Sequence, residues 1–242
     1  MTTTALTHDD WMALTRTEYV RMDELLDGLT AEEWLRETDC GDWRVREVVA
    51  HLVGAGESNA SFRELLRQAR IGRAAAHGRD LVDGMNDVQV RERTGLTPDQ
   101  LLLALRDVAP RAVAGRARYP AWLRSTPLPL GPPVGTKPLG HLLGPIYTRD
   151  LWMHRVDISR AVGRDLVLTS EHDGALVADV VDEWARAHGR PYRLTLTGPA
   201  GGTFASTDAA DVVPLELDAV EFLRGVSGRA PDVVTYGTRV TF

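Results

Sequence analysis

The chain has 242 residues, of which 43% are hydrophobic and 26% charged, so it can bury the core of one large domain or two small ones. Its formal charge of −6 and its pI of about 5.7 argue against nucleic acid or an anionic membrane surface as the main partner.

Three further features favour a cytoplasmic protein without a membrane anchor. Cys40 is the single cysteine, which excludes an intrachain disulfide and suits a reducing compartment. No run of about eighteen apolar residues occurs, so no transmembrane helix is expected. The first ten residues lack a basic region followed by an apolar one, so they do not form a signal peptide.

Helices dominate the expected structure up to residue 118. Thr30 and Glu33 form a capping box, and Pro98 suits the first position of a helix. The second long helix is expected to break near Gly54 or Gly56. Residues 71–82 read as a loop or irregular helix that leaves His77 exposed. The expected helices cover residues 9–29, 44–70, 83–93 and 97–118.

Residues 119–145 are rich in proline and glycine and are expected to form a long loop. Loops of this length inside a compact domain are often functional. Two interpretations are open: the segment lines the mouth of a pocket, or it is a plain connection.

The next stretch, residues 146–164, predicts a helix that carries an ionisable stripe. It has no internal glycine or proline before Gly163, which supplies a stop. Asp150, His154 and Asp157 fall on one face, surrounded by apolar residues. Burying them costs several kcal/mol unless they are paired or bind a cation.

Two interpretations of this stripe follow from the residues alone. An acid and a histidine four positions apart can reach one divalent ion from one helix. Equally, Asp150 and His154 can hydrogen-bond to each other without any metal. A metal needs a further ligand from another helix, and His51 lies at the edge of the apolar face formed by Val48 and its neighbours. By itself, His51 fits a histidine at the edge of the core equally well.

The last third of the chain mixes helices with short strands. Thr169 or Ser170 is expected to cap a helix that runs to His188, and Asp218 to cap one that ends at Gly228. Residues 198–202 predict a hairpin turn. The expected strands are residues 192–197, 203–206, 212–217 and 233–242.

Two segments resemble a known family. Trp43-Arg-Val-Arg-Glu-Val-Val-Ala-His-Leu-Val53 and the segment from Asp150 to Arg164 are similar to the ligand segments of the mycothiol-dependent maleylpyruvate isomerases. Residues 192–229 resemble the small C-terminal domain of that family, which ends a helix with Gly228-Arg229. The resemblance implies a DinB-like four-helix bundle over residues 1–163, followed by a sterol-carrier-like α+β domain over residues 164–242.

The resemblance also implies a site. It places a divalent metal, most often zinc, on His51, Asp150 and His154. Asp150 stands where the isomerases often have glutamate, which leaves the identity of the ion open. Asp157 and Arg229 are the candidate catalytic residues: Asp157 to orient His154 or form a salt bridge, Arg229 to hold a substrate carboxylate or close its helix.

The expected function is that of a metal-dependent isomerase or S-transferase that uses a low-molecular-weight thiol, mycothiol, on a small electrophile such as maleylpyruvate. The only cysteine, Cys40, is placed in a loop and not on the metal stripe, so the thiol is expected to come from a cosubstrate. Two alternatives use the same scaffold: a non-catalytic metal or small-ligand binding protein, and a hydrolase with a metal-activated water. A monomer or homodimer is expected, with no nucleic-acid partner.

Overall fold

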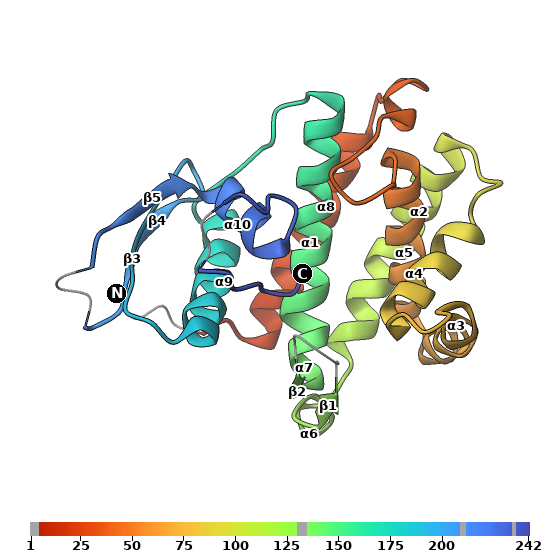
Figure 1. Ribbon diagram of the computed structural model, residues 1–242. Coiled ribbons are helices and arrows are strands. Elements are labelled where there is room, and N and C mark those ends of the chain that lie inside the picture. Colours follow the sequence, from red (N-terminus) through yellow and green to blue (C-terminus); the bar gives the residue numbers. More distant parts are fainter. Residues whose placement is uncertain (1–4, 130–134, 209–211, 234–235) are drawn as a thin grey trace. The chain divides into compact units, whose positions relative to one another are not determined.

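The chain folds into two compact units, which are a helical bundle and a small α+β domain. The computed structural model describes residues 5–129, 135–208, 212–233 and 236–242. The bundle comprises residues 8–165, and the second unit comprises residues 166–242 with the described residues of the N-terminal segment. The colour gradient in Figure 1 follows the chain through both units.

Four long helices, α1, α2, α5 and α8, form the bundle, and the α3–α4 pair flanks it beside α2 (Figure 1). Each of the four contacts two others of the set as its neighbours in the ring. The bundle also contains short elements between the long helices. The helices are α1 (His8–Leu26), the 3-10 helix η1 (Glu33–Leu35), α2 (Val45–Ala60), α3 (Phe62–Ala75), α4 (Leu81–Arg91), α5 (Pro98–Ala117), α6 (Ala121–Arg124), α7 (Leu139–His141), the π-helical turn η2 (Leu142–Ile146) and α8 (Tyr147–Val162).

The apolar faces of these helices meet in one core. Leucine and valine side chains recur at helical spacing along α2 and α5, and they pack against the inner faces of α1 and α8. This packing holds α2 and α8 against each other. The fully buried members include Met22, Leu26, Val45, Val48, Val49, Leu52, Val53, Leu101, Leu105, Val108, Leu151 and Ile158.

Helix ends follow the predicted caps. Thr30 and Glu33 exchange hydrogen bonds of 2.7 and 3.2 Å, which confirms the capping box that leads into η1. Thr97 and Gln100 form a second capping box at the start of α5, with Pro98 at the first helical position. Gly163 ends α8 in the left-handed conformation, with φ of 71°.

The predicted break in the second helix is at the wrong place. Gly54 and Gly56 lie inside α2, and the chain instead turns at Ser61, whose backbone is extended and whose hydroxyl caps α3. A Cβ on Gly54 would lie 2.6 Å from the Cβ of Gln89, and one on Gly56 would lie 2.9 Å from a methyl of Val108. Gly54 therefore lets α4 pack closely against α2, and Gly56 does the same for α5. The helix propensity of glycine alone does not reveal this role.

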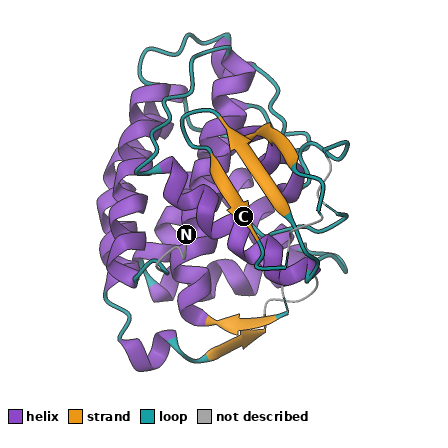
Figure 2. Ribbon diagram, turned by 90° about the vertical axis from the view of Figure 1, so that its left-hand side faces the viewer, coloured by secondary structure: helices purple, strands orange, loops and turns teal. Residues whose placement is uncertain are grey.

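The prediction of one long loop over residues 119–145 is also wrong. The described part contains α6 and a two-stranded antiparallel ribbon, β1 (Pro127–Pro129) and β2 (Thr136–Pro138), which Figure 2 draws as a pair of short strands. It continues through α7 and η2 directly into α8. Residues 130–134 lie outside the described part of the chain.

A buried arginine attaches the start of α8 to α5. Arg116 donates hydrogen bonds to the carbonyl oxygens of Leu143 and Gly144, at 2.6 and 3.2 Å, and to the hydroxyl of Thr148 at 3.0 Å. A π-helical turn leaves carbonyl groups without their usual helical partners, and the guanidinium supplies donors for them. This contact positions the first turn of α8, which carries Asp150.

The second unit is a three-stranded sheet with two helices. β3 is central, antiparallel to β4 and parallel to β5, with Leu194 opposite both Phe204 and Leu215. Asp218 caps α10 by accepting hydrogen bonds from the backbone of Val220 and Glu221, as predicted. The elements are α9 (Asp173–His188), β3 (Arg193–Thr197), β4 (Gly202–Ala205), β5 (Leu215–Asp218) and α10 (Ala219–Ser227).

Two predictions for this unit need correction. α9 begins at Asp173 rather than at Thr169 or Ser170, because the Asp173 carboxylate accepts a 2.6 Å hydrogen bond from the Thr169 backbone and closes a turn ahead of the helix. Among residues 233 and 236–242, none lies in a strand, although their composition favours one. In that segment the backbone N–H of Val240 bonds to the carbonyl of Val226 in α10.

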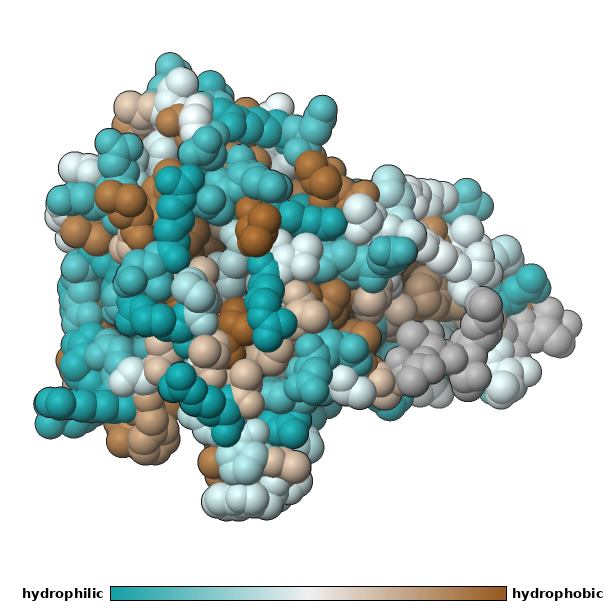
Figure 3. All heavy atoms as spheres, turned by 180° about the vertical axis from the view of Figure 1, so that it is seen from behind, coloured by the Kyte–Doolittle hydropathy of each residue, from teal (hydrophilic) through white to brown (hydrophobic). Residues whose placement is uncertain are grey.

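Across the described residues, every helix is too short or too polar to cross a lipid bilayer. On the face seen in Figure 3, hydrophobic residues occur in small groups between hydrophilic ones. Scattered exposed apolar residues of this kind are ordinary for a folded protein.

We predict that Gly56→Val lowers the free energy of unfolding by about 1–3 kcal/mol, because the added side chain overpacks the contact with Val108. Chemical denaturation measures the effect. Gly95→Val is the matched control: no atom lies within 4 Å of a Cβ built on Gly95, so its effect should stay within about 0.5 kcal/mol. Equal effects of the two changes would contradict the close approach of α5 to α2.

Candidate metal centre

His51 in the middle of α2 faces Asp150 and His154 on α8. The Nε2 atom of His51 lies 3.4 Å from one carboxylate oxygen of Asp150, and the Nε2 atom of His154 lies 3.3 Å from the other. The two imidazole rings are 5.1 Å apart and nearly perpendicular. One ring nitrogen from each histidine and one oxygen of Asp150 therefore lie within 4.8 Å of one another.

The three side chains differ in exposure. Both histidines are buried, while the side chain of Asp150 is 25% exposed. The cluster is therefore closed on the side of the imidazoles and reachable beside the carboxylate. Solvent access at one ligand is typical of a metal site that keeps an open position rather than of an enclosed structural site.

The outer nitrogens of both histidines have their own partners. Nδ1 of His51 lies 2.8 Å from the side-chain oxygen of Gln89, and Nδ1 of His154 lies 3.1 Å from a carboxylate oxygen of Asp157. Asp157 is fully buried, so it lies where the sequence placed it, on the stripe behind His154. Outer partners of this kind turn the Nε2 atoms inward and orient an imidazole as a ligand.

Charge is concentrated in this small volume. Burial opposes ionisation of Asp150, but the neighbouring histidines, His154 first, hold the pKa of its carboxyl well below the usual range. Burial likewise opposes the charged form of His154, yet Asp150 and Asp157 raise the pKa of this imidazole well above its usual value. In the absence of a cation, a protonated His154 between two carboxylates compensates the buried charge.

The donor set fits a divalent cation. Two imidazole nitrogens and one carboxylate oxygen are a common set for catalytic zinc, in which three protein ligands leave a further position open. An ion there would take over the role of the proton on His154, since both Nε2 atoms and the carboxylate converge on the same point. The same donors also suit other first-row divalent metals.

Two residues that the sequence did not suggest lie beside this cluster. The ring of Trp43 is 5.2 Å from that of His51 and 6.3 Å from that of His154, so it covers one side of the histidine pair. The sulfur of Cys40 lies within 4.8 Å of a His154 nitrogen and an Asp157 oxygen. Cys40 lies in a loop, as predicted, but this loop precedes α2 and brings the sulfur beside His154, which the sequence did not indicate.

Two partly buried tyrosines, Tyr19 and Tyr147, lie close enough to Asp150 to feel its charge. Burial raises the pKa of both Tyr19 and Tyr147 to about 12, and the charge of Asp150 contributes to each shift. Both hydroxyls therefore stay protonated at neutral pH. The sequence placed Tyr19 in the apolar band of the first helix, and neither phenol gave a signal for the site.

Arg229 belongs to the second unit. It follows the left-handed Gly228 at the end of α10, and its backbone N–H bonds to the carbonyl of Arg224 at 2.9 Å. The expectation that its guanidinium serves the metal pocket stays a prediction.

Comparison with known proteins gives two findings. The family described as "Mycothiol maleylpyruvate isomerase N-terminal domain" matches residues 15–159, which include His51, Asp150 and His154. Two solved structures resemble the chain, the mycothiol-dependent maleylpyruvate isomerase and a histidine-to-alanine mutant of it. Each has a TM-score of 0.57 at 17% identity and covers 94% of this chain and 91% of its own.

At that identity the structural likeness establishes the shared fold, a helical bundle with a small α+β domain. No curated protein matches the sequence. The family match spans more than half of the chain and contains every residue of the cluster. The chain therefore belongs to the mycothiol maleylpyruvate isomerase N-terminal domain family.

Proposed function

We propose that this protein is a metal-dependent enzyme that uses mycothiol either to isomerise a small acidic electrophile of the maleylpyruvate type or to form a thioether conjugate with it. The convergence of His51, Asp150 and His154 beside an accessible carboxylate edge carries the proposal. Membership of a family named after such an isomerase supports the thiol and the substrate class.

In this proposal His51, Asp150 and His154 would hold the ion, with zinc as the expected metal. A bound divalent cation lowers the pKa of a thiol, so that the thiolate is available near neutral pH. Trp43 would exclude water from the histidine side of the site, and the protonated Tyr19 and Tyr147 would add no negative charge beside Asp150.

The chemistry needs no redox partner. The thiolate adds to one carbon of a cis double bond, and the new single bond rotates. Loss of the same thiolate then restores the double bond in the trans form. In a transfer reaction the adduct instead takes up a proton and leaves as product. Both routes begin with the same activated thiol, and a hydrolase would require turnover without it.

We predict that His154→Ala removes the bound metal, because the cluster loses one of its two nitrogen donors. Elemental analysis of the purified protein should find about one divalent ion per chain in the wild type and nearly none in the variant. His77→Ala is the control, since His77 is exposed in the turn after α3. Equal metal contents in wild type and His154→Ala would contradict the ligand assignment.

We predict that mycothiol raises the melting temperature of the metal-loaded protein and leaves that of the metal-free protein nearly unchanged. A ligand at a hundred times its Kd stabilises the folded state by about 2.7 kcal/mol. A thermal-shift titration with mycothiol, glutathione and bacillithiol measures the preference. If no thiol stabilises the loaded form more than the metal-free form, and none supports turnover, the thiol mechanism is wrong.

Cys40→Ser is the control for the source of the thiol. Cys40 groups with His154 and Asp157 rather than with the set formed by His51, Asp150 and His154. The variant should therefore keep turnover that depends on added thiol. Turnover by the wild type without any thiol, lost in Cys40→Ser, would instead make Cys40 the nucleophile.

We further propose that Arg229 binds a substrate carboxylate, because a guanidinium can hold a carboxylate through two parallel hydrogen bonds. Arg229→Met should then raise KM for an acidic substrate about 10- to 100-fold and change kcat less. This factor corresponds to the free energy that hydrogen bonds to a charged group contribute to binding. Arg193→Met on the exposed face of β3 is the control. An unchanged KM would leave Arg229 with the role of closing α10.

A further inference from the structure

A line of buried side chains leads from His51 across α4 to α3. Nδ1 of His51 lies 2.8 Å from Oε1 of Gln89, and Nε2 of Gln89 donates to Oε1 of Gln68 at 2.8 Å. Nε2 of Gln68 then donates to the backbone oxygen of Gly54 and to Oε1 of Glu64, both at 2.9 Å. Two amide groups therefore connect the histidine to a carboxylate at the edge of the bundle.

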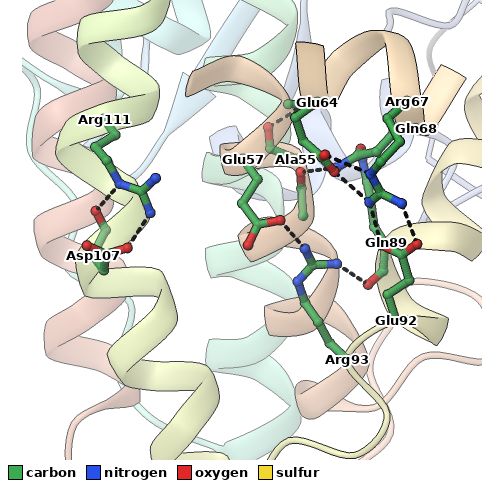
Figure 4. A network of polar contacts seen from close by, with 12 residues as sticks. Ala55, Glu57, Glu64, Arg67, Gln68, Gln89, Glu92, Arg93, Asp107 and Arg111 are labelled. Atoms are coloured by element: carbon green, nitrogen blue, oxygen red, sulfur yellow. Dashed lines mark hydrogen bonds and ion pairs between the residues drawn. The ribbon is translucent and has the colours of Figure 1, made fainter. Parts of the chain in front are cut away.

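The amides of this line are shielded from water. Gln68 is fully buried and Gln89 is 3% exposed, in the space between α2, α3 and α4. Figure 4 shows both glutamines beside Glu64 and Arg67. Arg93 donates a 2.7 Å hydrogen bond to the backbone oxygen of Gln89. Gly54 makes room for Gln89, whose Cβ and Cγ would each lie 2.6 Å from a Cβ at that position. Buried amides of this kind need all of their hydrogen bonds satisfied.

The acceptors at the Gln68 end of the line determine which group donates and which accepts in each of its hydrogen bonds. A backbone carbonyl can only accept a hydrogen bond, and so can an ionised carboxylate. The amide nitrogen of Gln68 must therefore face Gly54 and Glu64, which leaves its oxygen toward Gln89. The amide nitrogen of Gln89 must in turn face Gln68, which leaves its oxygen toward His51. Nδ1 of His51 must then carry a proton and donate it to that oxygen.

Arg67 keeps the terminal carboxylate ionised and in place. Its guanidinium donates to both oxygens of Glu64, at 2.6 and 2.7 Å, and to both oxygens of Glu92, each at 2.7 Å. Chiefly because of these hydrogen bonds to Arg67, the pKa of Glu64 lies below its usual value. Glu64 therefore stays an acceptor at neutral pH.

We propose that Gln89 and Gln68 are positioning residues that keep a proton on Nδ1 of His51, so that Nε2, which lies on the side of Asp150, is the ring nitrogen left to bind a cation. The polarity of the line comes from the acceptors at its far end, Gly54 and Glu64. This role rests on the proposed metal site, because the tautomer it selects is the one in which Nε2 can bind a cation.

The first test reads the tautomer directly. Long-range proton–nitrogen NMR spectra of the full chain, freed of metal and labelled with nitrogen-15 in histidine, report which ring nitrogen carries the proton. His51→Ala identifies the signals by their loss. The wild type should show the proton on Nδ1. Gln89→Met removes the acceptor and should give a mixture of tautomers, whereas Gln89→Glu keeps an acceptor and should retain the wild-type tautomer.

The second test measures zinc binding by competition with a chromophoric chelator. Gln89→Met should weaken zinc binding about 10- to 100-fold, the usual effect of losing the partner behind a ligating histidine. Gln68→Met removes the partner that fixes the Gln89 amide, so this amide can rotate and exchange its oxygen and nitrogen. The variant should show mixed His51 tautomers and a smaller loss of zinc affinity than Gln89→Met. Wild-type tautomer and affinity in Gln68→Met would overturn the role of Gln68.

Val88→Ala controls for mere loosening of α4, since Val88 is fully buried next to Gln89 but takes no part in the line. It should lower stability while leaving the tautomer and the zinc affinity unchanged. An unaltered tautomer with unaltered affinity in Gln89→Met would overturn the proposal. Absence of zinc binding by the wild type would instead refute the metal site itself, so the two failures are distinct.

Discussion

The close approach of α2 and α8 puts two imidazoles and a carboxylate into one small, largely buried volume. The stability of this helix contact requires that the charge of the carboxylate be compensated. An uncompensated buried charge costs several kcal/mol, so a proton or a cation must sit between the three groups. The apolar faces that bring α2 and α8 together are therefore inseparable from the polar cluster between them. The same contact between α2 and α8 therefore contributes to the stability of the bundle and positions the candidate metal ligands.

The two histidines are supported in different ways. His154 has a carboxylate behind it, and that of Asp157 is fully buried, whereas His51 has the neutral amide of Gln89. A carboxylate partner makes an imidazole more basic and a stronger ligand, while an amide orients the ring without adding charge. With the carboxylates of Asp150 and Asp157 already beside the histidines, a third carboxylate behind His51 would add repulsion. The amide line avoids it by keeping its charge at Glu64, where Arg67 neutralises it.

Close packing at glycine makes the amide line possible. α4 can lie against α2 only because Gly54 has no side chain, and this contact brings Gln89 within reach of His51. The solved relatives share the fold at 17% identity, so the bundle tolerates wide change in sequence. Here its inner polar groups form one connected set from α8 through α2 and α4 to α3.

Short-range patterns in the sequence were enough to predict several local features of this protein. The helical stripe of Asp150, His154 and Asp157 follows from spacing along one helix, and the caps at Thr30, Thr97 and Asp218 follow from side chains that bond within a few residues. His51 could be joined to that stripe only through a family resemblance, since 99 residues separate it from Asp150.

Other features of the site depend on how distant parts of the chain pack together. The positions of Cys40, Trp43 and Gln89 around the histidines depend on how a loop and a flanking helix pack against α2 and α8, and no local pattern encodes such contacts. The same reason explains why Gly54 looked like a helix break. Its meaning lies in the neighbouring helix, whose approach is a property of the folded bundle rather than of the residues on either side of it.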